Sequence, residues 1–193
     1  MGITLKRNEF EISHLLNKGK SFEDQDQQLH AIQIYTQLID RFPEDFRAYC
    51  KLADLYARTD REEHAIELVE EMISRFGLHT EAMLYVVDFL SVRKQFMKSL
   101  EIIQKIRTTE SPITVFYSGM LNLEVEQFDR AYSDFQEFLT LGEDQLFNDQ
   151  AYLFLARITI HQKRYQETGQ YINILKSTKK KNYELYLLEA IMH

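Results

Sequence analysis

The sequence predicts an all-α protein, a right-handed solenoid of about five antiparallel helix pairs followed by a terminal helix. Helical stretches recur at a fixed period: Ala31 and Ala65 open equivalent helices 34 residues apart, and Pro43 marks the turn between them. The composition agrees, because 45% hydrophobic and 27% charged residues suit an ordered domain, and two prolines and six glycines leave little material for linkers. A helix pair of this size buries its apolar face only by stacking on its neighbours, so the period indicates a solenoid.

Each predicted unit carries a small residue in its first helix and another, twelve residues later, that opens its second helix. The five pairs are Gly19 and Ala31, Ala53 and Ala65, Val87 and Ser99, Gly119 and Ala131, and Ala156 and Thr168. From unit to unit the first members are 34, 34, 32 and 37 residues apart, so we expect length variation in the turns between units. The small residue lets the second helix approach closely, and aliphatic or aromatic residues three or four positions away fill the remaining space.

These steps predict one domain over residues 1–193. Its units are expected at about 12–45, 46–79, 80–111, 112–148 and 149–182, with a terminal helix at 183–193. That last helix would be the first half of a sixth unit. Either it caps the solenoid, or the natural chain continues beyond His193.

The second unit has the most regular pattern. It carries Tyr49, Leu52, Ala53 and Tyr56, followed by Ala65, Val69 and a turn at Gly77. This pattern resembles the tetratricopeptide repeat (TPR) family, whose units read W-x2-L-G-x2-Y, then A-x3-F, then P. The resemblance extends over about residues 12 to 193. Four polar residues depart from it, at positions where the family has large apolar side chains: Lys18, Ser118, Asn122 and Thr159.

Sequence motifs of catalysis and metal binding are absent. The six histidines lie far apart in the sequence and include no i, i+4 pair, and the chain has no phosphate-binding loop and no nucleophile elbow. We therefore predict no catalytic residue, no metal site and no cofactor. The single Cys50 has no disulfide partner, and its apolar helical setting indicates a packed thiol.

Charge and hydropathy narrow the class of partner. The net charge of −7 disfavours nucleic acid and membrane surfaces, since phosphate binding needs clustered positive charge. No run of eighteen apolar residues and no apolar leader within residues 1–30 is present, which predicts no membrane insertion and a cytoplasmic location.

The resemblance implies that one face of the first helices lines a concave groove, where such proteins hold an extended peptide or a helix of a partner. In this chain the groove positions change character along the sequence. The early positions are charged or polar: Asn17, Arg47, Lys51 and Asp54. The later ones are mainly apolar and are expected to form an exposed patch: Leu84, Tyr85, Asp88, Phe116, Tyr117, Met120, Leu153, Phe154 and Arg157.

Function is therefore expected from surfaces. We predict a non-enzymatic interaction scaffold or adaptor that binds a protein or peptide partner through an apolar segment. Two alternatives stay open: a regulatory or assembly subunit that forms a homo-oligomer through the groove, and an accessory domain of a larger enzyme.

The charged positions allow a narrower interpretation. Asn17, Arg47 and Lys51 resemble part of the clamp with which some TPR domains grip the C-terminal carboxylates of heat-shock chaperones, whose first residues would lie before Met1. The alternative is a local pair between Lys51 and Asp54, three residues apart on one helix face.

Overall fold

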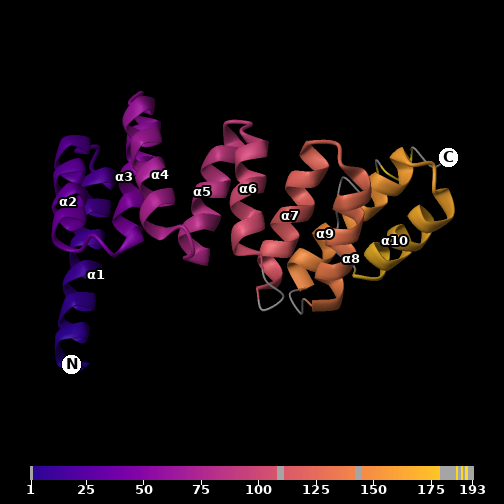
Figure 1. Cartoon of the computed structure of the whole chain (residues 1–193), viewed down its shortest axis with the longest axis horizontal. Coiled ribbons are helices and arrows are strands. Elements are labelled where there is room, and N and C mark those ends of the chain that lie inside the picture. Colours follow the sequence, from indigo (N-terminus) through magenta and orange to yellow (C-terminus); the bar gives the residue numbers. More distant parts are fainter. Residues whose placement is uncertain are drawn as a thin grey trace. The chain divides into compact units, whose positions relative to one another are not determined.

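The computed structural model describes residues 2–107, 111–141 and 145–178, together with positions 186, 188 and 190. Within these residues the secondary structure is helical, without strands, which confirms the predicted all-α class. The helices are α1 (Gly2–Asp24), α2 (Gln28–Arg41), α3 (Phe46–Arg58), α4 (Glu62–Phe76), α5 (Thr80–Val92), α6 (Phe96–Ile106), α7 (Pro112–Glu124), α8 (Phe128–Leu141), α9 (Gln145–His161) and α10 (Tyr165–Ser177) (Figure 1). No helix in the described part of the chain is both long and apolar enough to cross a bilayer.

The helices group into two compact units, Met1–Phe89 and Leu90–His193, with the division inside α5. Each unit is described by itself below. The prediction of a single domain over residues 1–193 stays a prediction.

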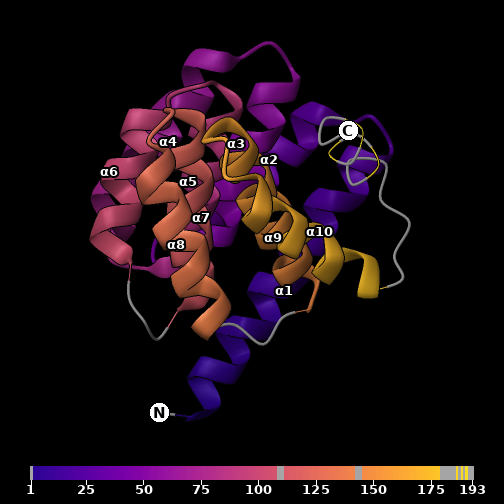
Figure 2. The same ribbon diagram turned by 90° about the vertical axis from the view of Figure 1, so that its right-hand side faces the viewer.

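In the first unit, α1 packs on α2 and α3 on α4, and α2 contacts α3. The small residues act as the repeat spacing predicts: a Cβ at Gly19 would clash with the ring of Tyr35, which is fully buried. Leu38 and Leu52 continue this core. Helix α1 begins at Gly2, ten residues before the predicted start of the first unit, and its N-terminal part extends past α2 (Figures 1 and 2).

In the second unit, α7 packs on α8 and α9 on α10, with further contacts of α6 with α7 and of α8 with α9. A Cβ at Gly119 would lie 2.8 Å from Cε1 of Phe135, so this glycine is required by the close approach of α8. Helix α9 starts at Gln145, four residues before the predicted start of its unit. Of the predicted terminal helix, positions 186, 188 and 190 are helical and Leu188 is buried in the core; the rest of 183–193 lies outside the described residues.

The turn inside each helix pair repeats with the same steps as the small residues. Seven positions after the small residue of each first helix, one residue adopts the left-handed conformation, with φ between 55° and 59°. These residues are Asp26, Asp60, Lys94, Glu126 and Lys163. The following N–H donates back to a carbonyl five residues earlier, as from Gln127 to Asn122 at 2.8 Å. This is the Schellman arrangement that closes a helix C-terminus. The backbone conformation of this turn is therefore repeated in all five places, although the side chains differ.

Two polar departures from the family pattern share one buried partner. The Asp134 carboxylate accepts hydrogen bonds from Ser118 Oγ and Asn122 Nδ2, each at 2.7 Å, and pairs with Arg107 Nη1 at 2.9 Å. A carboxylate is tolerated in a core only when such donors satisfy it. The polar residues of α7 are therefore matched by one acid on α8.

Candidate functional site

In the first unit the predicted groove positions lie on α1, α3 and α5, and the cation nearest the start of α3 is already occupied. Arg47 donates to both carboxylate oxygens of Glu9, at 2.8 and 2.9 Å, and its Nε lies 3.0 Å from Asp45 Oδ1. The hydrogen bonds that Arg47 donates to Asp45 and Glu9 raise its pKa above the ordinary value. Two carboxylates of the chain itself therefore neutralise this guanidinium, which weighs against a carboxylate clamp.

The expected local pair between Lys51 and Asp54 does not form, and this prediction is wrong. Asp54 Oδ1 instead accepts a hydrogen bond from the hydroxyl of Tyr85 at 2.8 Å, and the same hydroxyl lies 3.0 Å from the carbonyl oxygen of Cys50. Tyr85 of α5 reaches across to α3, so a phenol occupies the carboxylate. Lys51 is exposed and makes no ion pair with any residue that the structure describes.

The remaining positions of this face differ in exposure. Asn17 and Asp88 are exposed, and Leu84 is half-buried. Burial raises the pKa of the Cys50 thiol to about 12, so this cysteine is protonated at neutral pH and does not react readily.

In the second unit the structure corrects the predicted apolar patch. Phe116 is only 1% exposed and Leu153 only 6%, so neither presents itself to a partner. The Phe116 ring contacts four other rings, those of Phe135, Phe138, Phe147 and Phe154, at centroid distances of 5.1 to 6.1 Å.

The physical reason is helix geometry. Both residues stand three positions before the small residue of their helix, and side chains three apart share a face. Phe116 and Leu153 therefore belong to the packing face of their helices, which is wider than we predicted. The neighbouring position, two before the small residue, carries Tyr117 and Phe154, which are only partly buried.

Four of the predicted residues thus form what we call the α7–α9 face: Tyr117, Met120, Phe154 and Arg157. Arg157 is exposed, and its guanidinium carbon lies 5.9 Å from the centroid of the Phe154 ring. Tyr117, Met120 and Phe154 pack against the buried core residues of the second unit. The face combines aromatic and thioether surface with one cation, and such surfaces favour binding to apolar segments.

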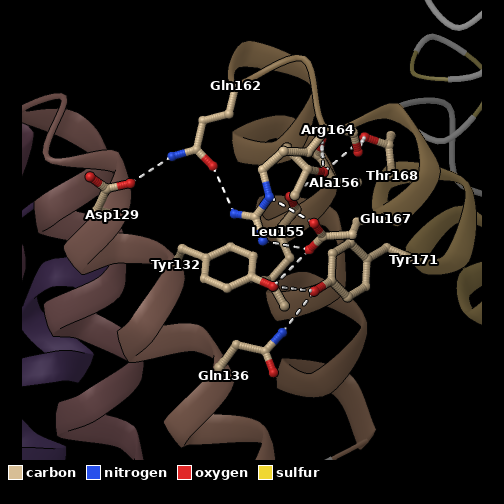
Figure 3. Close-up of polar contacts among 11 residues, drawn as sticks. Asp129, Tyr132, Gln136, Leu155, Ala156, Gln162, Arg164, Glu167, Thr168 and Tyr171 are labelled. Carbon is tan, nitrogen blue, oxygen red and sulfur yellow. Dashed lines mark hydrogen bonds and ion pairs between the residues drawn. The ribbon is translucent and has the colours of Figure 1, made fainter.

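A polar cluster on α8 and α10 was missed by the sequence reasoning (Figure 3). The hydroxyls of Tyr132 and Tyr171 lie 3.0 Å apart, and Gln136 Nε2 donates to Tyr171 at 2.7 Å. Arg164 lies over the Tyr132 ring at 4.3 Å and donates from Nε to Glu167 at 2.8 Å. This hydrogen bond lowers the pKa of Glu167. Tyrosines at helical spacing looked like core residues, and nothing in the spacing indicated that their hydroxyls would meet.

Metal binding finds no support in the described ranges, where no group of three His, Cys, Asp or Glu side chains converges. Four of the described histidines, His30, His64, His79 and His161, instead contact aromatic rings: His161 stacks on Phe128 with centroids 4.0 Å apart, and His64 lies 5.2 Å from Tyr56. These four side chains act as packing residues.

Comparison with known proteins shows the fold. No family model matches the chain, and no curated protein matches its sequence. Solved structures do match it. The structure of PilF from Pseudomonas aeruginosa is 15% identical, with a TM-score of 0.73 over 94% of this chain and 82% of that one. A tetratricopeptide repeat protein from Parabacteroides merdae is 16% identical, with a TM-score of 0.73 over 94% of this chain and 72% of that one.

A third match is a thermophilic TPR protein from Thermus thermophilus. It is 12% identical, with a TM-score of 0.61 over 94% of this chain and 98% of that one. Matches of this identity show the fold alone. The chain accordingly has the TPR fold, a solenoid of antiparallel helix pairs.

Proposed function

We propose that this chain is a non-enzymatic interaction scaffold that holds an apolar segment of a partner protein, as an extended peptide or an amphipathic helix. The observation that carries the proposal is the α7–α9 face. Three large side chains stay partly accessible there although the adjoining Phe116 and Leu153 are buried. Aromatic anchors beside a packed core are typical of binding hot spots.

The fold supports the same proposal, because first-helix faces in such solenoids are the expected binding surfaces. The proposed face carries no pair of acid and base groups within hydrogen-bond reach, which general acid–base chemistry would need. The cytoplasmic location of the protein stays a prediction, and so does the absence of nucleic acid among its partners.

The test is affinity capture from cell extract followed by mass spectrometry, with the wild type beside a Tyr117→Ser, Met120→Ser variant. Both side chains are half-buried, so their truncation removes contact surface and leaves the buried ring cluster around Phe116 intact. We expect the variant to lose the main captured protein. A Gln170→Ala, Asn173→Ala variant, changed at exposed positions of α10, serves as the matched control.

A main captured protein that the Tyr117, Met120 variant retains at the wild-type level would contradict the proposal. Size measurement on the purified chain separates the alternative of self-association. A dimer that the same two substitutions dissociate would replace the scaffold proposal by assembly through this face.

A further inference from the structure

A second candidate surface lies in the first unit, on the side of the second helices. Helices α2 and α4 enclose a slot of about 270 Å³ above α3. Its floor is apolar, and its rim carries hydroxyl, imidazole and carboxylate groups. The lining residues are Thr36, Ile39, Leu52, Tyr56, His64, Glu67, Leu68 and Glu71. This volume lies below the roughly 300–1,000 Å³ of small-molecule sites and suits one large side chain.

The matching place in the second unit is occupied by a side chain of the chain itself. Counted from the small residues, Leu68 corresponds to Tyr171, Thr36 to Gln136 and Leu52 to Leu155. There Tyr171 fills the space between α8 and α10, and Gln136 holds its hydroxyl at 2.7 Å (Figure 3). In the first unit the shorter Leu68 and Thr36 leave the same position open.

Two polar side chains at the slot, Tyr56 and Glu67, keep their polar groups available. Neither the Tyr56 hydroxyl nor the Glu67 carboxylate makes a hydrogen bond or ion pair with a residue that the structure describes, and Glu67 is exposed. The Glu71 carboxylate already accepts hydrogen bonds from the Tyr49 hydroxyl at 3.3 Å and from Arg75 Nη2 at 3.2 Å. Glu67 is therefore the carboxylate available to a ligand.

Charge decides which ligand fits. Helix α4 carries five glutamates against a single arginine, so its exposed side is strongly acidic. A cation with an apolar stem can cover Ile39, Leu52 and Leu68 with its methylenes and place its charge at Glu67. The planar guanidinium fits better than an ammonium, because it can stack on Tyr56 and bind a carboxylate through two donors.

We propose that the slot between α2 and α4 binds an arginine side chain from a basic segment of a partner polypeptide. The arginine stem packs on the leucines of the floor, and its guanidinium pairs with Glu67 beside the Tyr56 ring. The second unit shows the same chemistry internally, where Arg164 lies over Tyr132 and pairs with Glu167. This inference does not depend on the α7–α9 face.

The test is a titration of the full chain, labelled with carbon-13 in its isoleucine and leucine methyl groups, with the peptide acetyl-Gly-Leu-Arg-Leu-Arg-Gly-amide. We expect saturable shifts at Ile39, Leu52 and Leu68 that weaken as salt rises, since a partly exposed ion pair is screened. A peptide with citrulline in place of arginine keeps the shape and lacks the charge. It should bind about tenfold more weakly, as expected for the loss of a charged hydrogen bond.

Two slot variants and one control locate the site. Glu67→Gln should weaken binding of the arginine peptide by about tenfold, while Glu63→Gln, an exposed glutamate one turn away that does not line the slot, should leave it unchanged. Leu68→Tyr combined with Thr36→Gln copies the closed arrangement of the second unit and should abolish binding. The Glu67→Gln variant keeps the test decisive if the double variant folds poorly.

Three results would overturn the proposal: equal binding of the citrulline peptide, equal effects of the two glutamate variants, or methyl shifts confined to residues outside the slot. Shifts at the slot that grow with protein concentration in the absence of peptide would also overturn it, in favour of a second copy of the chain. Unchanged capture by a Tyr117, Met120 variant bears only on the α7–α9 face, so the two proposals fail separately.

Discussion

Single residues decide how closely the two helices of a pair approach, and the glycines show this most clearly. Gly119 faces the Phe135 ring, whereas a Cβ at Gly169 in α10 would meet no atom within 4 Å. The two residues are chemically identical, but one lies against a packed ring and the other faces open space. The first is a packing requirement, and the second only adds conformational freedom to the unfolded chain.

This contrast gives a prediction about stability. Gly119→Ala should lower the free energy of unfolding by about 1–3 kcal/mol, because the added methyl group overpacks the contact with α8. Gly169→Ala should raise it by about 0.5–1 kcal/mol, because alanine restricts the unfolded chain without a clash. Urea unfolding followed by circular dichroism measures both, and equal effects of the two substitutions would contradict the packing argument.

A buried carboxylate in the first unit gives a prediction about pH. Burial alone would raise the pKa of Glu23, but hydrogen bonds from Tyr35 and Arg58 outweigh it and hold the pKa below its ordinary value. A group with a depressed folded pKa stabilises the protein above its unfolded pKa of about 4.3 and loses this effect as the pH falls through the folded value.

We therefore expect the wild type to be more stable than Glu23→Gln at pH 6 and the two unfolding curves to converge as the pH falls below about 4. Denaturant unfolding at several pH values measures this. Glu63→Gln, on an exposed glutamate, is the control and should stay parallel to the wild type. A constant difference between Glu23→Gln and the wild type at every pH would show that the carboxylate contributes no proton-linked stability.

Many of the packing positions could be predicted from the sequence, but the contacts between helices could not. The twelve-residue spacing correctly identified positions of close approach such as Gly19 and Gly119. It failed at Phe116, because the boundary between packing face and open face depends on how large the neighbouring rings are. It also could not reveal that Tyr85 would reach Asp54, since that contact joins residues 31 apart in different helices.

At the scale of elements, the turns inside the helix pairs are built alike, and they contain residues that are not ideal for their backbone. Lys94 adopts φ of 58°, a left-handed conformation that costs side chains other than glycine roughly 1–2 kcal/mol. The sequence steps of 34, 34, 32 and 37 predicted where these turns recur. They did not predict the conformation, because glycine, its usual signal, is missing at all five positions.

Lys94→Gly should therefore raise the free energy of unfolding by about 0.5–1 kcal/mol, the relief of the left-handed strain less the entropy that glycine adds. Lys94→Val should lower it, since a branched side chain tolerates this conformation least. Thermal unfolding of the two variants measures the difference. A less stable glycine variant would mean that the lysine side chain itself stabilises the turn.

The helix pair α7 and α8 is joined by the buried Asp134 network. Asp134→Ala should destabilise the protein by about 3 kcal/mol, because Ser118 and Asn122 would keep buried polar groups without a partner. Restoring apolar residues at all three positions (Ser118→Ala, Asn122→Leu, Asp134→Leu) should recover most of that loss, as replacing a whole buried polar network often does. If the triple variant is as unstable as Asp134→Ala, the network is not what limits this pair.

At the scale of the whole molecule, the repeat spacing predicted the order of the elements and the TPR fold, but it gave no sign of the division into two units. The boundary between Phe89 and Leu90 falls inside α5, where neither glycine nor proline marks it. Contact density rather than local sequence sets such a boundary. It follows from contacts between residues of different helices, which the local sequence does not reveal.

The division has a consequence for stability that can be measured. In a solenoid each repeat is stabilised mainly by its nearest neighbours, so a defect should loosen its own surroundings first. Gly119→Ala should speed native-state amide exchange in α7 to α10 by roughly five- to thirtyfold, the factor for one to two kcal/mol, while α1 to α4 change little. Gly19→Ala, which places a methyl group against Tyr35 in the first unit, should produce the reverse pattern. Exchange that increases equally throughout α1 to α10 for both variants would show that the chain opens as one cooperative body, and the two units would then have no independent stability.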